Sequence, residues 1–212
     1  RGKGALKRGR MILDGAKARV EAAGISQVSI RLRHGDVVET VQELEADARV
    51  VILGKRGESA DFAKGHLGSN LERVARSCTR PVLVAARAFT PAQRCLIAFD
   101  GGTSSLKAVD MAARSPFFAG LEIHVLMVGP GTPETQRKLD GAVAMLSAAG
   151  HVITAGFEQG QPDEVITTYV EREKIGLLVM GAYGHSRIRN MIIGSTTTEM
   201  VRSCKVPVLL FR

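Results

Sequence analysis

Short apolar runs without polar alternation recur through the C-terminal part of the chain, separated by stretches in which apolar residues have helical spacing. The runs predict strands at residues 95–99, 122–128, 152–157, 177–180 and 207–211. The intervening stretches predict helices at residues 104–115, 133–149, 162–173 and 195–204. Alternating strands and helices are typical of an α/β sheet, and uninterrupted apolar runs suit strands covered on both faces. We therefore predict an open parallel five-stranded sheet flanked by helices.

The sequence also repeats itself at an offset of about 126 residues, since 200 − 74 = 126 and 142 − 16 = 126. Four segments recur in one order: residues 16–24 on 142–150, 49–54 on 176–181, 68–69 on 194–195, and 74–84 on 200–210. The last pair shares Arg-Ser-Cys and Pro-Val-Leu, and the first pair closes each predicted helix with a glycine, Gly24 or Gly150. Glycine is favoured just beyond a helix C-terminus. Self-similarity of this kind indicates two tandem copies of one fold.

The two copies differ in completeness. Residues 93–212 form the complete second copy, and residues 1–88 form a first copy that lacks the opening strand, helix and strand. Residues 88–93 are the predicted linker. Either the first copy borrows strands from elsewhere or a segment is missing from the chain. A sheet without its central strand would expose an edge prone to aggregation, which favours the missing segment.

A glycine-rich stretch follows the fourth strand of the second copy. It contains Gly181 and Gly184, then Gly194 and Ser195, followed by threonines at 196 to 198. Glycine lets the backbone approach a ligand closely, so that its N–H groups can surround phosphate oxygens. A helix predicted to start near Ser195 would add the positive end of its dipole. This stretch therefore favours a phosphate group as ligand.

Asp100 ends the first strand of the second copy. Ligands of open parallel sheets bind at the carboxyl ends of strands, where the strand order reverses. If the first and fourth strands are neighbours, Asp100 with its following glycines and Gly181 with Gly184 form two sides of one crevice. Asp100 could then accept hydrogen bonds from a ribose or an adenine amine, or hold a metal ion.

The pattern Gly181-x2-Gly184-x9-Gly194-Ser195, with Asp100 upstream and Val-Pro-Val-Leu-Leu near the end, resembles the universal stress protein family. The resemblance covers residues 93–212 fully and 3–88 in part. It implies the adenine nucleotide alpha hydrolase-like fold, ATP as ligand with Mg²⁺ as a potential companion, and a homodimer. The cofactor-binding residues that it implies are Asp100, Val128, Met180, Gly181, Gly184, Gly194, Ser195, Thr196 and Thr197.

Structural roles alone could account for each of these residues taken singly. The glycines could be turn residues, and Thr196 with Glu199 matches a helix capping box. The first copy departs from the family spacing, because ten residues rather than nine separate Gly57 from Gly68, and it has no strand-end aspartate. Its Ser69 and Glu72 also match a capping box, so its nucleotide binding stays open.

Composition is that of an ordinary soluble protein, with 45% hydrophobic and 24% charged residues, no export signal and no apolar run long enough to span a membrane. We expect a cytoplasmic location and three reduced core thiols, at Cys78, Cys95 and Cys204. The formal charge of +8 concentrates in residues 1–35, where nine cations face two acids. Without interleaved aromatic residues, this charge is a weak nucleic-acid signal.

Motifs for nucleophilic, metal or Walker-type catalysis are absent from the sequence, so a dedicated enzyme is not expected. The resemblance implies a nucleotide-dependent regulator or sensor of stress. Two alternatives stay open: a slow ATPase or phosphotransfer enzyme, and a scaffold without nucleotide that binds protein or nucleic acid through its basic N-terminal face.

Overall fold

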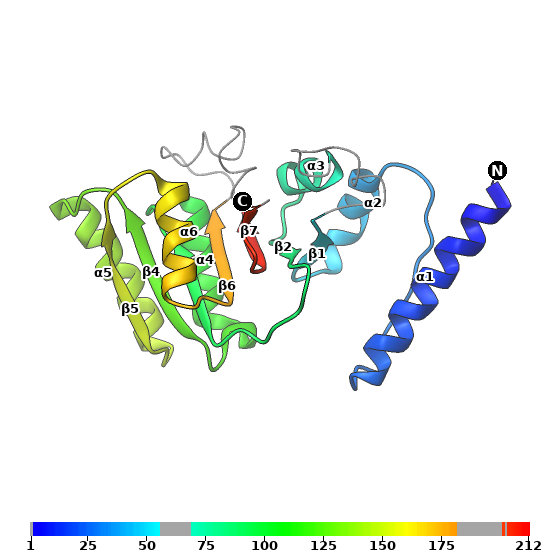
Figure 1. Cartoon of the computed structure of the whole chain (residues 1–212), viewed down its shortest axis with the longest axis horizontal. Helices are drawn as coiled ribbons and strands as arrows, with labels where there is room; N and C mark the ends of the chain where they lie inside the picture. Colours follow the sequence, from blue (N-terminus) through cyan, green and yellow to red (C-terminus); the bar gives the residue numbers. More distant parts are fainter. Residues whose placement is uncertain (1, 56–68, 182–200, 202) are drawn as a thin grey trace. The chain divides into compact units, whose positions relative to one another are not determined.

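The computed structural model describes residues 2–55, 69–181, 201 and 203–212 (Figure 1). Two compact units are present, Arg1–Thr40 and Val41–Arg212. Among the described residues, no helix combines the length and the apolar character needed to cross a bilayer.

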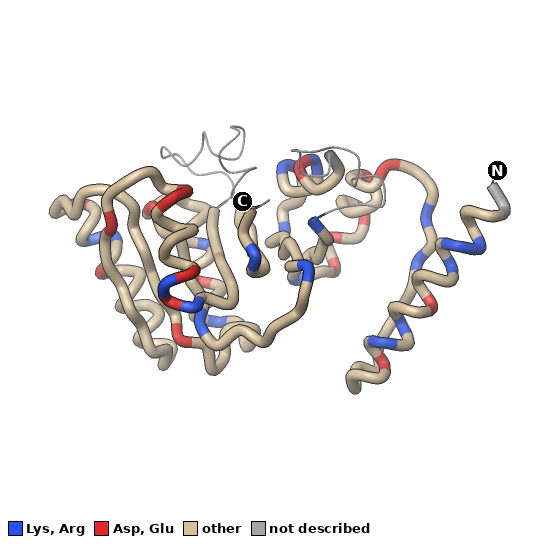
Figure 2. The backbone as a smooth tube through the Cα atoms, viewed as in Figure 1, with Lys and Arg blue, Asp and Glu red and all other residues tan. Residues whose placement is uncertain are grey.

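The first unit consists of α1 (Gly2–Ala22), an extended stretch and the start of α2 (Val37–Leu44). Figure 2 shows Lys and Arg spread along α1 with a few acids among them. One of these cations, Lys17, lies 3.7 Å from the carboxylate of Glu21, one helical turn later. Part of the charge of α1 is therefore compensated within the helix itself.

The second unit contains the sheet and its helices. After the end of α2 come η1 (Glu45–Asp47), β1 (Val51–Gly54), α3 (Ser69–Ser77), β2 (Val82–Ala85), β3 (Arg94–Ala98), α4 (Thr103–Arg114), η3 (Pro116–Phe118), β4 (Glu122–Val128), α5 (Pro133–Ala148), β5 (Ile153–Glu158), α6 (Pro162–Arg172), β6 (Leu177–Gly181) and β7 (Val208–Phe211). The predicted strands of the second copy all lie within one or two residues of the observed ones. The helix predicted at 195–204 lies largely outside the described residues.

The glycines that close the repeated helices adopt the same conformation. Gly24 follows α1 with φ of +93°, and Gly150 follows α5 with φ of +87°. Beyond each glycine, the next amide donates to a carbonyl five residues earlier, from Ile25 to Val20 and from His151 to Leu146. This is the Schellman arrangement, in which a left-handed glycine ends the helix. The prediction of glycine caps is confirmed at both positions.

One seven-stranded sheet has the order β1-β2-β7-β6-β3-β4-β5. The five strands of the second copy are mutually parallel, as predicted. The sheet extends further than predicted, because β2 pairs with β7 in antiparallel orientation and β1 pairs with β2 in parallel. Leu83 lies opposite Leu209 at the centre of the antiparallel pairing. These two leucines are 209 − 83 = 126 residues apart, which equals the sequence repeat.

Helices cover both faces of the parallel part of the sheet. On one face, Cys95, Ile97 and Val179 pack with residues of α4 and α5 in a continuous buried core. Side chains alternate along a strand, so residues such as His124 in β4 point to the opposite face. There, Nδ1 of His124 lies 2.8 Å from the hydroxyl of Tyr169 in α6. In Figure 1, α6 lies in front of the strands and α4 lies behind them.

All three cysteines are free and buried, in agreement with the prediction of core thiols. Burial, with a smaller contribution from the neighbouring Glu45 carboxylate, raises the pKa of Cys78 to about 11. Burial also raises the pKa values of Cys95 and Cys204. These thiols are therefore protonated at neutral pH and behave as small apolar side chains.

Candidate functional site

The carboxyl ends of three adjacent parallel strands meet at one edge of the sheet. β3 lies between β4 and β6, and Ala98 of β3 is opposite both Leu126 and Met180. The first and fourth strands of the second copy are therefore neighbours, which was the condition for a shared crevice. Because the strands are parallel, the chain leaves all three at the same edge.

Strand order reverses between β3 and β6. From β3 the chain proceeds to β4 and β5 on one side, and then returns to place β6 and β7 on the other side. A reversal of this kind separates the two connecting loops and leaves room for a ligand between them. In open sheets of this kind, the edge between β3 and β6 is accordingly the position at which a ligand is expected to bind.

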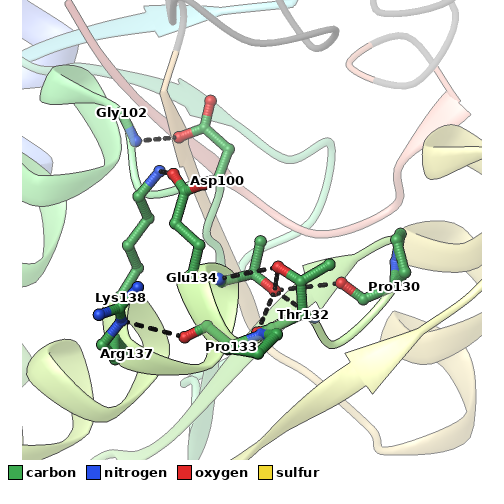
Figure 3. Close-up of polar contacts among 9 residues, drawn as sticks. Asp100, Gly102, Pro130, Thr132, Pro133, Glu134, Arg137 and Lys138 are labelled. Carbon is green, nitrogen blue, oxygen red and sulfur yellow. Dashed lines mark hydrogen bonds and ion pairs between the residues drawn. The ribbon is translucent and has the colours of Figure 1, made fainter.

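Asp100 follows β3 at this edge and is held in a fixed orientation (Figure 3). Its Oδ1 accepts a hydrogen bond from the main-chain N–H of Gly102 at 2.8 Å and another from Oγ of Ser105 at 2.6 Å. Gly101, which lies between Asp100 and Gly102, has φ of +72°, a left-handed conformation that most side chains disfavour. The turn therefore directs the half-buried carboxylate across the start of α4.

The start of α4 lies against the end of β6, and glycine permits this close approach. A Cβ atom on Gly181 would lie 2.9 Å from Cβ of Ser104 and 3.3 Å from the main-chain nitrogen of Ser105. Both distances are shorter than ordinary van der Waals contact. Gly181 thus brings the end of β6 beside the amide groups of the first turn of α4.

A third side of this edge is formed by the first turns of α5 (Figure 3). Thr132 caps α5 through a reciprocal capping box with Thr135. Nζ of Lys138 lies 2.8 Å from Oε1 of Glu134 one turn earlier. Hydrogen bonding from this ammonium lowers the pKa of Glu134. The stem of Lys138 covers Gly101, because a Cβ there would lie 2.6 Å from its Cδ.

Sequence reasoning missed Lys138 and Ser105 as neighbours of Asp100. No motif marks them: Lys138 is one of several charged residues on a surface helix, and Ser105 is one of two serines at a helix start. Their proximity to Asp100 arises only when the turn after β3 and the position of α5 are known.

The structure brings together four of the predicted site residues. Asp100 follows β3, Val128 ends β4, and Met180 with Gly181 ends β6, all at the same edge. Met180 is buried, whereas the other three are partly exposed. The remaining predicted site residues, Gly184, Gly194, Ser195, Thr196 and Thr197, lie outside the described residues. Their relation to Asp100 therefore stays a prediction.

The corresponding edge of the first copy is built differently. Gly54 ends β1, and the described part of the sheet places only β2 beside that strand. Nζ of Lys55, directly after β1, donates a hydrogen bond to the main-chain oxygen of Cys204. Gly57 and Gly68 lie outside the described residues. Glu72, in the first turn of α3, pairs with Arg76.

His124 lies in β4, as predicted, and its contacts are internal. Its Nδ1 faces Tyr169, and its Nε2 lies 3.1 Å from Oε1 of Glu122. Arg94 binds the other oxygen of that carboxylate at 2.9 Å. Hydrogen bonds from Arg94 and His124 lower the pKa of Glu122. This chain of contacts ties β3, β4 and α6 together at the end of the sheet where β3 and β4 begin.

Comparison with known proteins gives a consistent family assignment. The model of the universal stress protein family matches residues 3–86 and 91–212. The universal stress protein Slr1230 of Synechocystis is 39% identical over 97% of this chain and 72% of its own length. Universal stress protein Rv1996 of Mycobacterium tuberculosis is 24% identical over 88% of this chain and 66% of its own length.

Among solved structures, a universal stress protein from Archaeoglobus fulgidus matches with a TM-score of 0.75 and 24% identity, covering 96% of this chain and 76% of that one. The fold is that of an α/β protein with a mostly parallel sheet whose strand order reverses between β3 and β6. The chain belongs to the universal stress protein family. It spans about two thirds to three quarters of the length of these relatives.

Proposed function

We propose that the second copy, residues 93–212, binds an adenine nucleotide, specifically ATP, and that the protein acts as a nucleotide-dependent stress regulator. The observation that carries this proposal is the adjacency of β3 and β6 at the reversal of strand order, with Asp100 and Gly181 on its two sides. The family assignment supports it, because the sequence retains the glycine spacing of the branch that it resembles.

Asp100 is proposed to recognise the nucleoside. An ionised carboxylate accepts up to about four hydrogen bonds and donates none, so it suits ribose hydroxyls or an amine. The two bonds from Gly102 and Ser105 fix its direction before a ligand arrives. A fixed acceptor loses less conformational entropy on binding than a mobile one. Val128 is proposed to meet the adenine through its main chain. Met180, whose side chain is buried, and Gly181 are proposed to flank the ribose and the phosphates.

The phosphates are proposed to bind Gly184, Gly194, Ser195, Thr196 and Thr197 through amides and hydroxyls. Gly181 leads the chain into this segment from a position beside the first turn of α4. Lys138 is proposed to contribute positive charge, because its stem already lies over the turn that follows Asp100. Mg²⁺ would be held in this proposal by the phosphates together with Asp100 or Ser195.

We further propose that the strand pair β1–β2 and the strand pair β6–β7 are related by a local twofold axis. The pairing of Leu83 with Leu209 supports this relation, because a twofold axis must pass through a pair of equivalent residues. Val82 opposite Leu210 and Val84 opposite Val208 are then exchanged by the same axis. In this proposal, the antiparallel join between β2 and β7 is the internal counterpart of a dimer contact.

Mass spectrometry of small molecules released from the denatured protein tests the nucleotide proposal. ATP or ADP is expected from the wild type and not from the Gly184→Ala, Gly194→Val double variant. The matched control is Gly57→Ala, Gly68→Val, which alters the corresponding glycines of the first copy. Absence of nucleotide from the wild type, with no binding of added ATP, would contradict the proposal. Equal loss in both double variants would argue against a site restricted to the second copy.

Turnover of labelled ATP separates a regulator from a slow enzyme. The sequence shows no obvious general base in motif form, so slow turnover or none is expected. Steady release of labelled phosphate that Asp100→Ala abolishes would favour the ATPase alternative instead.

A further inference from the structure

Ser105 is a buried serine in the first turn of α4, with 1% of its surface exposed. Its Oγ lies 2.6 Å from Oδ1 of Asp100 and 3.0 Å from the main-chain oxygen of Gly102. A hydroxyl carries one hydrogen, so it donates a full hydrogen bond to only one of these oxygens at a time. The distance to Asp100 is that of a charge-assisted bond between a hydroxyl and a carboxylate. The hydrogen of Ser105 is therefore directed at Asp100.

The start of α4 does not depend on this hydroxyl. The main-chain oxygen of Gly102 already accepts the N–H of Leu106 at 2.9 Å, which is the regular first hydrogen bond of the helix. The serine hydroxyl thus serves the carboxylate of Asp100 rather than the backbone of its own helix.

The carboxylate of Asp100 is confined from two sides. The N–H of Gly102 and the hydroxyl of Ser105 both donate to the same oxygen, Oδ1. A Cβ atom on Gly102 would lie 3.1 Å from Oδ1 and 3.3 Å from Oδ2, so the carboxylate lies directly against this glycine. Two bonds to one oxygen fix the rotation of the carboxylate, and its second oxygen, Oδ2, consequently has one direction.

The place of Asp100 along the sheet edge assigns it to the middle of a nucleotide. β3 lies between β4 and β6. In the proposed function, on which this inference rests, Val128 at the end of β4 meets the adenine and the segment after β6 binds the phosphates. Neighbouring strands are about 4.8 Å apart, so Asp100 after β3 lies opposite the ribose that joins the two groups. The hydroxyls of a ribose are donors, which a carboxylate accepts.

We propose that Ser105 is a positioning residue of the nucleotide site, and that it sets the preference of this site for ribonucleotides over deoxyribonucleotides. Ser105 acts through Asp100 and does not itself contact the nucleotide. Its hydrogen bond is shielded from water by burial and holds the carboxylate toward a ribose hydroxyl. A fixed acceptor rejects a ligand without that hydroxyl, because the acceptor is then left unpaired. A carboxylate that can turn away discriminates less.

Calorimetric titration of ATP, 2′-deoxyATP and 3′-deoxyATP tests the proposal. The measured quantity is the ratio of the affinity for ATP to the affinity for the more weakly bound deoxynucleotide. This ratio should be about ten or more in the wild type and about three or less in Ser105→Ala. All three ligands are titrated into the same variant, so a partial loss of fold lowers every affinity alike and leaves the ratio unchanged.

Ser115→Ala is the matched control, because it removes a hydroxyl from the residue that follows the other end of α4. The Oγ of Ser115 accepts the N–H of Phe117 at 3.3 Å, far along the helix from Asp100. The ratio in this variant should equal that of the wild type. Ser105→Cys repeats the test if the alanine variant does not fold, since a thiol has a similar size and is a weak donor. Its ratio should also fall below that of the wild type.

A wild-type ratio in Ser105→Ala, or in Ser105→Cys where that variant is used, would overturn the role of Ser105 while nucleotide binding stands. A ratio of about one in the wild type would overturn the assignment of Asp100 to the ribose, again with ATP still bound. Failure of the wild type to bind ATP would contradict the proposed function itself, and this inference with it.

Discussion

β1 and β6 come from matching segments of the repeated sequence, yet they have different surroundings. β6 lies between β7 and β3, and its first four residues are buried. β1 pairs with β2 at the end of the sheet, and exposed residues alternate along it with half-buried ones. A similar apolar run therefore becomes a central strand in one copy and an edge strand in the other. Burial is decided by the neighbouring strands rather than by the run itself.

The same difference explains why one copy has a candidate site. At β6, the neighbouring β3 supplies Asp100 and the turn into α4. At β1, the described sheet supplies no equivalent of β3 beside the strand. A glycine at the strand end is common to both copies, as Gly54 and Gly181. The start of α4 packs against Gly181.

Substituting these two glycines should give the largest contrast in stability. Gly181→Val would force its side chain into Ser104 and the backbone of Ser105, and should lower the free energy of unfolding by about 3 kcal/mol. Gly54→Val places a side chain at an exposed position of β1 and should change it by less than about 0.5 kcal/mol. Urea unfolding followed by circular dichroism measures both. Equal effects would show that the two strand ends are packed alike.

Val179 of β6 and Ile52 of β1 occupy matching positions of the repeat, and truncating each to Ala should give a somewhat smaller difference in stability. Val179→Ala removes two carbons from a fully buried position and should cost about 2 kcal/mol, from lost burial plus a cavity. Ile52→Ala removes three carbons, but Ile52 is 66% exposed, so the cost should be under about 0.5 kcal/mol. Unfolding midpoints of the two variants test this order. A larger loss at Ile52 would indicate that another segment covers β1.

Glu45 and Glu171 occupy matching positions of the repeat, and their contributions to stability should depend differently on pH. Burial tends to raise the pKa of Glu45, but hydrogen bonds from Cys78, Thr79 and Arg80 outweigh it and hold the pKa below its ordinary value of 4.5. A lowered pKa stabilises the fold above pH 4.5, and this stabilisation is lost as the pH falls through the folded-state pKa. Glu171, which is 171 − 45 = 126 residues later, is exposed.

Glu45→Gln should therefore cost about 1 kcal/mol at pH 7, with the difference from wild type shrinking below about pH 4. Glu171→Gln is the matched control and should cost less than about 0.5 kcal/mol at either pH. Urea unfolding at pH 7 and at about pH 3 provides the comparison. A constant difference at both pH values would contradict the role assigned to the Glu45 carboxylate.

The smallest effect is expected at Lys138. Lys138→Gln should weaken ATP binding roughly threefold, because an exposed cation contributes little across solvent. Arg137→Gln, one residue earlier on α5, removes the same charge and should leave the affinity nearly unchanged. Binding isotherms at low salt resolve a difference of this size. A larger loss at Arg137 would argue against the placement of phosphates near Lys138.

The parallel part of the fold could be predicted because each strand there is a continuous apolar run and each helix has its own start and stop residues. Gly24 and Gly150 could be assigned as caps for the same reason. The antiparallel pairing of β2 with β7 could not, since an apolar run such as 82–85 has the same pattern in either orientation. That pairing joins residues 126 positions apart, for which no local signal exists.

The residues of the candidate site also fall into those that could be predicted from the sequence and those that could not. The positions of Asp100 and Gly181 at the ends of neighbouring strands could be predicted because strand ends and glycines are local features of the sequence. Ser105 and Lys138 could not, because their place depends on how the turn after β3 and the start of α5 pack. Glu45 was missed as well, since only the fold brings its carboxylate to the amide of Thr79 and the thiol of Cys78.

Calorimetric titration of ATP into the wild type and the Asp100→Ala variant tests most directly whether one copy alone carries the nucleotide. The account predicts one ATP bound per chain in the wild type and at least about tenfold weaker binding in the variant, because the oriented acceptor is lost. Asp140→Ala, at an exposed position of α5, is the control and should bind as the wild type does. Two equivalent sites per chain, or unchanged affinity in Asp100→Ala, would contradict the account.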